Sequence, residues 1–334
     1  MRRRRLGTGG PEVSAVGIGA MSFAGVYGAA TEEAAHAVLT AALDLGIDHI
    51  DTSNIYGMGL SERMIGAFLA RQGRAAAGMF RIATKGGITR DPETGARWFD
   101  NSRAHLEAEL DGSLRRLGLE TVDLYYVHRR DPALAIEEVT ETLAGFVRAG
   151  KIRAFGFSEI APSSLRRAAA VHPVAAVQSE YSLSTRLPEL GLIQTCEGLG
   201  TTLVAFSPVG RGLLTDRPPN RAAIEASSFL ASAPRFAEPD YAANLVEVAR
   251  FQALAAEMGT SAAALAIAWV LARAPECLAI PGTRSVRHLR ELAAGAALDL
   301  NGEDLARIET ALPVGWAHGD RYSRAAWVGP EMYC

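Results

Sequence analysis

The sequence predicts an α/β protein built as a single (β/α)₈ barrel of the TIM type. Short runs of β-branched and apolar residues alternate with longer amphipathic stretches from residue 47 almost to the end of the chain. This alternation indicates βα units around a parallel sheet. Eight strands can be counted, and eight strands close a barrel. The 334 residues show no domain boundary, repeat or low-complexity linker, so we expect one domain over residues 1–334.

The strands are expected where short apolar runs end in a polar or small residue. In chain order the candidates are Ala15–Ala20, Ile47–Asp51, Phe80–Lys85, Val122–His128, Ile152–Ser158, Ala175–Gln178, Thr202–Ser207 and Cys277–Pro281.

Helices are expected where the apolar residues recur with helical spacing. The candidates are Glu32–Leu45, Ser61–Ala70, Arg103–Leu117, Ile136–Ala149, Pro162–Ala170, Glu189–Gly200, Ala243–Arg273 as two helices broken near Gly259–Thr260, Val286–Ala294 and Asn301–Leu312. Asn301 is a suitable N-cap for this C-terminal helix, which a tail follows. The segments Gly86–Asn101 and Gly210–Pro239 have no clean period, so we expect two long loops at the C-terminal face of the barrel, where such loops usually bind ligands.

Composition excludes several classes of function. The net charge of −3 provides no basic face for nucleic acid, and the run Arg2–Arg5 is interpreted as a solvated tail. The chain contains neither a signal-peptide pattern nor an apolar run long enough to span a membrane, so we expect a cytoplasmic protein. Three widely spaced cysteines suggest neither a disulfide framework nor a zinc site, and no metal is expected.

Polar residues end several of the predicted strands, and in a barrel these ends meet at one open mouth. Asp51, Lys85 and His128 each end a strand, and Tyr56 follows Asp51 by five residues. Reduction of a carbonyl by hydride transfer produces an alkoxide, which needs a proton donor. A tyrosine can serve if a nearby ammonium lowers its pKa, as Lys85 would, while Asp51 holds the lysine in place. His128 could hydrogen-bond the carbonyl oxygen and orient the substrate.

Seven segments, taken together, form a pattern that is highly specific for one protein family. They are IDHIDTSNIYGMGLSERMIG (47–66), IATKGG (82–87), DLYYVHRRDP (123–132), GKIRAFGFSE (150–159), HPVAAVQSEYSL (172–183), AFSPVGRGLLT (205–215) and IPGTRSVRHLRE (280–291). Over nearly its whole length the chain resembles the aldo-keto reductases. With HRRDP, SEYSL and the closing GDRY (319–322), it is similar to the bacterial and plant branch of NADPH-dependent reductases.

The resemblance implies an oxidoreductase that reduces aldehydes or ketones to alcohols with NADPH, NADH being the less favoured cofactor. Asp51, Tyr56, Lys85 and His128 match the catalytic tetrad of the family, with Tyr56 as general acid. The cofactor positions implied are Met21, Asp51, Ser158, Gln178, Phe206, Ser207, Val209, Arg211, Gly282, Thr283, Arg284, His288 and Glu291. Ser158 and Gln178 would bond the nicotinamide amide, Phe206 would stack on its ring, and Arg284 would bind the 2′-phosphate.

The substrate pocket is expected to include Phe23, Tyr56, Trp98 and His128. Met21, Phe229 and Trp327 are further residues expected near the mouth. Three positions depart from the commonest family pattern: Glu159 stands where many members have Asn, His288 replaces a frequent Arg, and Leu292 replaces an Asn. These departures bear on cofactor affinity and on the strength of the NADPH preference.

Competing enzyme classes lack their motifs. The stretch Gly17–Ser22 lacks the third glycine of a Rossmann fingerprint, the seven histidines form no metal-ligand pattern, and no G-x-S-x-G elbow occurs. Two alternatives within the resemblance stay open: an NADPH-binding regulatory subunit with little turnover, and a sugar or pyridoxal dehydrogenase working in the oxidative direction. The expected partner is a small carbonyl compound; the sequence predicts neither its identity nor the oligomeric state.

Overall fold

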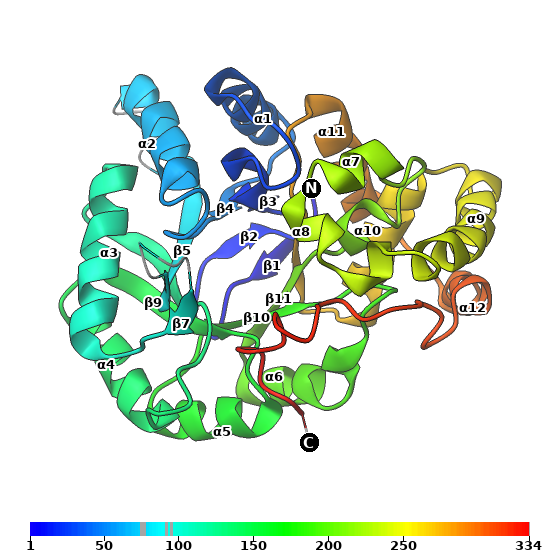
Figure 1. Cartoon of the computed structure of the whole chain (residues 1–334). Coiled ribbons are helices and arrows are strands. Elements are labelled where there is room, and N and C mark those ends of the chain that lie inside the picture. The colour runs from blue at the N-terminus through cyan, green and yellow to red at the C-terminus, as the bar shows by residue number, and fades with distance from the viewer. Residues whose placement is uncertain (74–77, 91–92, 94–95, 334) are drawn as a thin grey trace.

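The computed structural model describes residues 1–73, 78–90, 93 and 96–333 and has a barrel of parallel strands at its centre. The strands follow the ring order β3 (Ile18–Gly19), β4 (His49–Asp51), β5 (Arg81–Gly86), β8 (Val122–Val127), β9 (Ile152–Ser158), β10 (Ala176–Glu180), β11 (Thr202–Phe206) and β12 (Leu278–Ile280). Val16 bridges Ala279 in parallel, and the Gly17 amide donates to the Ala279 carbonyl at 2.8 Å, which closes the ring. The predicted barrel is confirmed (Figure 1).

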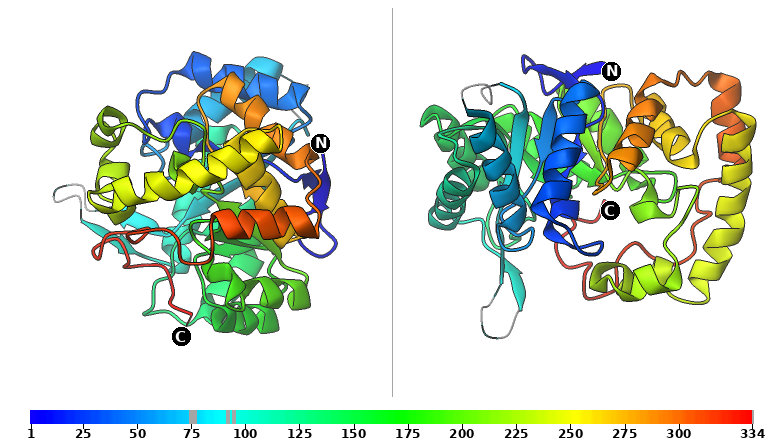
Figure 2. Two further views of the ribbon diagram at one scale, coloured as in Figure 1. Left: turned by 90° about the vertical axis from the view of Figure 1, so that its right-hand side faces the viewer. Right: turned by 90° about the horizontal axis from the view of Figure 1, so that it is seen from above.

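The helices surround the sheet, as Figures 1 and 2 show. Their bounds are α1 (Glu32–Asp44), α2 (Leu60–Gln72), α3 (Arg103–Leu117), α4 (Ile136–Arg148), α5 (Pro162–Val171), α6 (Leu192–Leu199), α9 (Asp240–Glu257), α10 (Ala262–Arg273), α11 (Val286–Ala294) and α12 (Gly302–Ala311). Every predicted helix is present. Asn301 caps α12 through a capping box, and α9 and α10 meet at a bend of 89° around the predicted break.

The two segments predicted as long loops contain regular structure. Residues 86–101 include the antiparallel hairpin β6 (Ile88–Arg90) and β7 (Arg97–Phe99), although residues 91, 92, 94 and 95 lie outside the described part. Residues 210–239 include the short helices α7 (Arg221–Glu225) and α8 (Ser228–Ala231), capped by the side chains of Asn220 and Ser227. Elements of three to five residues are too short to show a hydrophobic period, so the sequence predicted the two long loops but not the short elements within them.

The basic N-terminus is a second correction. Strands β1 (Arg3–Arg5) and β2 (Glu12–Ser14) form an antiparallel hairpin. Arg4 is buried and donates to the carbonyls of Leu271, Ala274 and Cys277. A charged side chain can be buried when carbonyl acceptors replace water, so this run is part of the packed structure rather than a solvated tail.

Neither a membrane span nor a metal cluster is found among the described residues. No single helix there is long and apolar enough to cross a membrane; α9 and α10 pass that test only as a bent pair. No group of three or more His, Cys, Asp or Glu side chains in the described ranges could hold a metal ion. Cys196 and Cys277 are buried free thiols, and Cys334 lies outside the described residues.

Candidate active site

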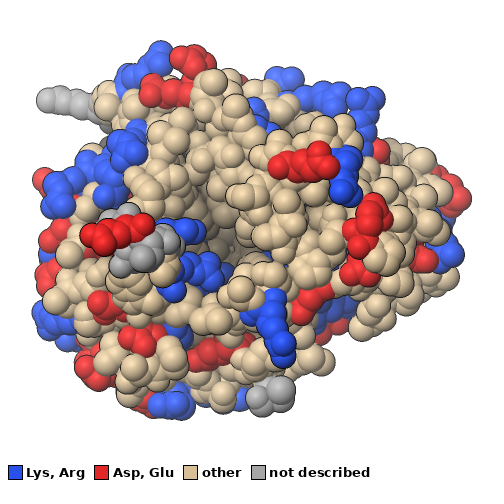
Figure 3. Space-filling model, viewed as in Figure 1, with Lys and Arg blue, Asp and Glu red and all other residues tan. Residues whose placement is uncertain are grey.

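A large cavity opens at the carboxyl ends of the strands (Figure 3). Its volume is about 1830 Å³, well above the roughly 300–1000 Å³ of a typical small-ligand pocket. One end, here called the catalytic end, is lined by Asp51, Tyr56 and His128. The other, here called the α11 end, is lined by residues 282–285, before α11, and by Arg287, His288 and residues 290–292 on it. A cavity of this volume has room for an extended ligand and a second molecule beside it.

Nearly all predicted site residues meet in this cavity. The lining includes Met21, Asp51, Tyr56, His128, Ser158, Gln178, Phe206, Ser207, Val209, Arg211, Gly282, Thr283, Arg284, His288 and Glu291. They come from seven of the eight strands or from the loops that follow them, since parallel strands bring all their carboxyl ends to one face.

Asp51 and Lys85 form a buried ion pair at the catalytic end. The Lys85 ammonium also donates to the Thr52 carbonyl at 2.7 Å, and the second Asp51 carboxylate oxygen accepts from the Gln178 amide at 2.8 Å. Lys85 is fully buried, so its charge is stable there only with such partners. Burial is the largest influence on both groups: it lowers the pKa of Lys85 and raises that of Asp51, and their pairing opposes both shifts.

Tyr56 and His128 lie over this ion pair. The Lys85 ammonium is 5.2 Å from the centre of the Tyr56 ring, and the Tyr56 and His128 rings meet edge to face with centroids 5.7 Å apart. The Ser53 hydroxyl is 3.1 Å from Nδ1 of His128, which leaves Nε2 as the other ring nitrogen. The tetrad inferred from resemblance is therefore assembled around one point of the cavity.

The electrostatics of Tyr56 differ from the expectation drawn from the sequence, which was that Lys85 lowers its pKa. Burial, followed by the Asp51 carboxylate, raises the pKa of Tyr56, and Arg129 is the group that opposes this shift. The phenol is therefore protonated at neutral pH in the unliganded protein, the form that can donate a proton. Burial, together with Arg129, Lys85 and Arg97, lowers the pKa of His128 well below its usual range, so this ring is neutral.

The residues expected to hold a nicotinamide ring are present at the catalytic end. Ser158 ends β9 and Gln178 lies opposite it on β10, in register. Ser158 accepts from Arg129 at 3.0 Å, and Gln178 contacts Asp51, so both side chains are held in place by protein partners. Phe206 is partly exposed at the end of β11 and presents an aromatic surface to the cavity. Amide-binding groups beside an aromatic wall fit a nicotinamide.

The α11 end has the features of an anion site. Arg284 donates to the carbonyls of Tyr27 and Ala29, at 2.7 Å for Tyr27, so this side chain is anchored by the opposite wall. Arg287, His288 and Arg290 are exposed at the start of α11 and line the same region, and Glu291 adds one carboxylate. Four basic side chains at a helix N-terminus fit the phosphate of an adenosine 2′-phosphate.

Two residues that were predicted to line the substrate pocket do not line the cavity. Phe23 is fully buried in the hydrophobic core and does not line the cavity, because the short 3₁₀ helix Ala20–Ala24 turns it inward. Trp98 on β7 is 46% exposed and is not among the lining residues. Of the residues expected near the mouth, Phe229 lines the cavity and Trp327 does not.

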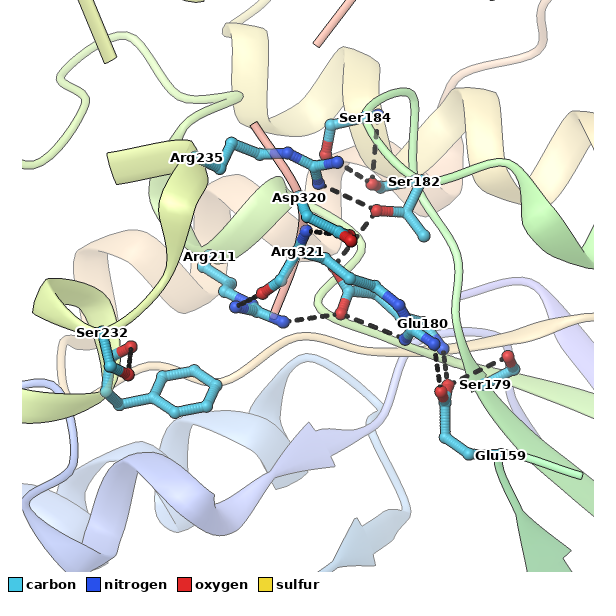
Figure 4. A network of polar contacts seen from close by, with 12 residues as sticks. Glu159, Ser179, Glu180, Ser182, Ser184, Arg211, Ser232, Arg235, Asp320 and Arg321 are labelled. Carbon is cyan, nitrogen blue, oxygen red and sulfur yellow. Dashed lines mark hydrogen bonds and ion pairs between the residues drawn. The ribbon is translucent and has the colours of Figure 1, made fainter. Parts of the chain in front are cut away.

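A buried ion-pair network ties the C-terminal tail to the barrel (Figure 4). Arg321 contacts the carboxylates of both Glu159 and Glu180, and Arg211 donates to Glu180 at 2.8 Å. Glu159 also accepts from the Ser179 hydroxyl and from the Glu180 amide. The Glu159 carboxylate is thus bonded to the tail, and Arg211, which the resemblance places among the cofactor positions, is bonded to Glu180. Arg321 belongs to the GDRY segment, but the sequence contains no signal that pairs it with carboxylates 140 or more positions away.

Two further residues at the catalytic end were not singled out from the sequence. Ser53 contacts His128, and it lies two residues after Asp51 in the quoted motif. Arg129 directly follows His128, is 9% exposed and lines the cavity. Its place in HRRDP, one residue beyond a strand-ending histidine, was the signal that could have found it.

Comparisons with known proteins agree with this geometry. The model of the aldo/keto reductase family matches residues 15–313. The aldo-keto reductase Yakc [NADP(+)] of Schizosaccharomyces pombe is 37% identical over 321 residues, covering 95% of this chain and 94% of that protein. A probable aldo-keto reductase of Glycine max is 35% identical, covering 95% and 91%. The solved glycerol dehydrogenase of Gluconobacter oxydans superimposes with a TM-score of 0.81 at 28% identity, covering 93% and 94% of the two chains. The chain therefore belongs to the aldo/keto reductase family of oxidoreductases.

Proposed function

We propose that this protein reduces small aldehydes or ketones to alcohols with NADPH, and that Tyr56 is the proton donor. The observation that carries the proposal is the position of the Tyr56 ring, 5.2 Å from the Lys85 ammonium and edge to face with His128 in one cavity. The NADP(+) in the name of the Schizosaccharomyces pombe relative and the basic α11 end support this cofactor.

The cofactor, when bound, supplies the hydride. Ser158 and Gln178 hold the nicotinamide amide, Phe206 covers one face of its ring, and Arg284 with Arg287 binds the 2′-phosphate. All of these side chains line the one cavity. Glu159 is not used here, because its carboxylate is engaged by Arg321.

Tyr56 then completes the reaction. As the substrate carbonyl oxygen gains negative charge, the Tyr56 hydroxyl transfers its proton to that oxygen. The Lys85 ammonium, fixed by Asp51 and the Thr52 carbonyl, stabilises the phenolate that forms. His128 is neutral, and with Ser53 at Nδ1 its Nε2 can donate to the same oxygen and orient it.

The test is nucleotide turnover by the purified protein in both directions. A panel of aldehydes and ketones with NADPH or NADH, and of sugars, glycerol and other alcohols with the oxidised cofactors, should show carbonyl-dependent NADPH consumption at neutral pH. A protein that quenches NADPH fluorescence on binding but consumes none would be a regulatory subunit. Faster turnover with alcohols than with carbonyls at matched concentrations would reverse the proposed direction.

A further inference from the structure

The cations at the catalytic end outnumber the carboxylates that could neutralise them. Lys85 pairs with Asp51, Arg211 with Glu180, and Arg321 with Glu159 and Glu180. Arg129 is also buried, with 9% of its surface exposed, yet no carboxylate in the described part of the chain lies within ion-pair distance of it. A buried charge without a partner is costly, so a guanidinium in this state calls for an anion from outside the chain.

The Arg129 side chain is fixed in place. One of its terminal nitrogens donates to the His128 carbonyl and to the Ser158 hydroxyl, at 3.0 Å for Ser158. Its backbone carbonyl accepts from Asn101, and Gly329 of the tail packs so close that an added Cβ would lie 3.3 Å from the Arg129 Cδ. Neither of the other two guanidinium nitrogens donates to any described residue, and the side chain lines the cavity.

A second arginine adds positive charge to the same wall. Arg97 on β7 lines the cavity and donates to the Val328 carbonyl of the tail. Arg129 is among the causes that lower the pKa of Arg97, and both arginines lower the pKa of His128, so the three groups are near one another. Figure 3 shows Lys and Arg side chains inside the hollow. Arg129 also lowers the pKa of the Glu159 carboxylate. That carboxylate is already bonded to Arg321, to the Ser179 hydroxyl and to the Glu180 amide.

We infer that Arg129, assisted by Arg97, forms an anion subsite that selects carbonyl substrates carrying a carboxylate. The inference rests on the proposed function and deepens it. A guanidinium with two unengaged nitrogens matches the two oxygens of a carboxylate. Because Arg129 follows His128 directly, a carboxylate bound there would leave the carbonyl group of a short substrate beside His128 and Tyr56.

The first measurement compares acids with their uncharged esters. Carboxybenzaldehyde and succinic semialdehyde are assayed against their methyl esters with NADPH and wild-type protein. A carboxylate gains charge-assisted hydrogen bonds that the ester cannot make, so kcat/KM should be higher for the acids by about tenfold or more. Equal or better use of the esters would overturn the subsite while leaving the proposed reductase intact.

The variants locate the effect. Arg129→Met removes the contact that holds Ser158 and so should slow both classes, but kcat/KM for the acids should fall on the order of tenfold or more further than kcat/KM for the esters. Arg97→Met should act in the same direction but more weakly, because this side chain is exposed. The matched control is Arg153→Met, which removes an equal charge from an exposed site at the opposite end of β9 and should change neither class.

Two outcomes separate this subsite from other roles of Arg129. Equal slowing of acids and esters in Arg129→Met would show that Arg129 acts on Ser158 or on the proton donor instead, since it bonds Ser158 and opposes the rise in the pKa of Tyr56. Calorimetric titration with benzoate tests the subsite without turnover: wild type should bind it, and Arg129→Met should not. If no aldehyde is reduced, esters included, the proposed function fails, and the benzoate titration still decides whether the anion subsite exists. Should Arg129→Met fail to fold, the acid and ester comparison on wild type and Arg97→Met remains decisive.

Discussion

The two ends of the cavity are built differently. At the catalytic end, Asp51, Lys85 and Gln178 are buried on strands and are already bonded to one another. At the α11 end, Arg287 and His288 are exposed on the first turns of a helix, and Arg284 is held by backbone carbonyls. A preorganised, dry environment amplifies electrostatic effects on a reaction. Exposed cations instead contribute binding energy that solvent partly screens. We therefore expect substitutions at the catalytic end to alter the rate of turnover and substitutions at the α11 end to alter the affinity for the cofactor.

The largest expected effect comes from Tyr56→Phe. The hydroxyl bonds to no other described residue, so its removal should leave the fold and cofactor affinity nearly unchanged. The rate of carbonyl-dependent NADPH oxidation should fall on the order of 10² or more, the contribution of a positioned general acid. Turnover is measured alongside fluorescence titration of NADPH. A variant that binds NADPH normally and keeps the wild-type rate would show that another group donates the proton.

Lys85→Met should produce a comparable loss of rate but, unlike Tyr56→Phe, should also destabilise the fold. It leaves the Asp51 carboxylate buried with Gln178 as its remaining partner, at a cost of about 3–5 kcal/mol in the free energy of unfolding. Denaturant unfolding of both variants checks the difference. If Tyr56 and Lys85 act as one unit, the double variant should be hardly slower than either single variant. A double variant whose loss of rate equals the product of the two single losses would instead show that Tyr56 and Lys85 act independently.

Arg321→Met tests the tail that closes the catalytic end. Glu159 and Glu180 would lose a buried cation, so the free energy of unfolding should fall by about 3 kcal/mol. Arg324→Met, on an exposed tail residue, is the control. A melting temperature within a degree of wild type would show that the tail contributes little to stability.

The same network predicts a pH dependence. Arg321 holds the pKa of Glu159 below its usual value, against the effect of burial. This stabilisation is complete above the unfolded pKa of about 4.3 and is lost as the pH falls through the folded value. Glu159→Gln should flatten this acid limb in thermal melts recorded from neutral to acid pH.

The smallest expected effect belongs to the α11 end. Wild type should bind NADPH at least about tenfold more tightly than NADH, which corresponds to one charged hydrogen bond. Arg284→Ala should remove most of this difference and leave NADH affinity nearly unchanged. Fluorescence titration with both cofactors measures it. Since Arg284 already donates to two carbonyls, an unchanged preference in the variant would assign phosphate binding to Arg287 and Arg290.

The sequence by itself determined the barrel and the strand ends at which Asp51, Lys85 and His128 lie. Apolar strands that end in Asp51, Lys85 and His128 repeat a local pattern, and the topology of a parallel barrel brings such ends together whatever the details of packing. Helix caps such as Asn301 are equally local, which is why helix positions could be predicted closely.

Only the tertiary structure decided which charges meet. Arg4 pairs with carbonyls more than 260 positions away, Arg321 reaches Glu159, and Arg129 is left without a carboxylate among the described residues. The turn that buries Phe23 and the hairpin that carries Trp98 likewise depend on contacts across the fold. Ion pairing depends on distance and burial in space, which residue spacing does not encode, so these pairings and the anion subsite could not be predicted from the chain alone.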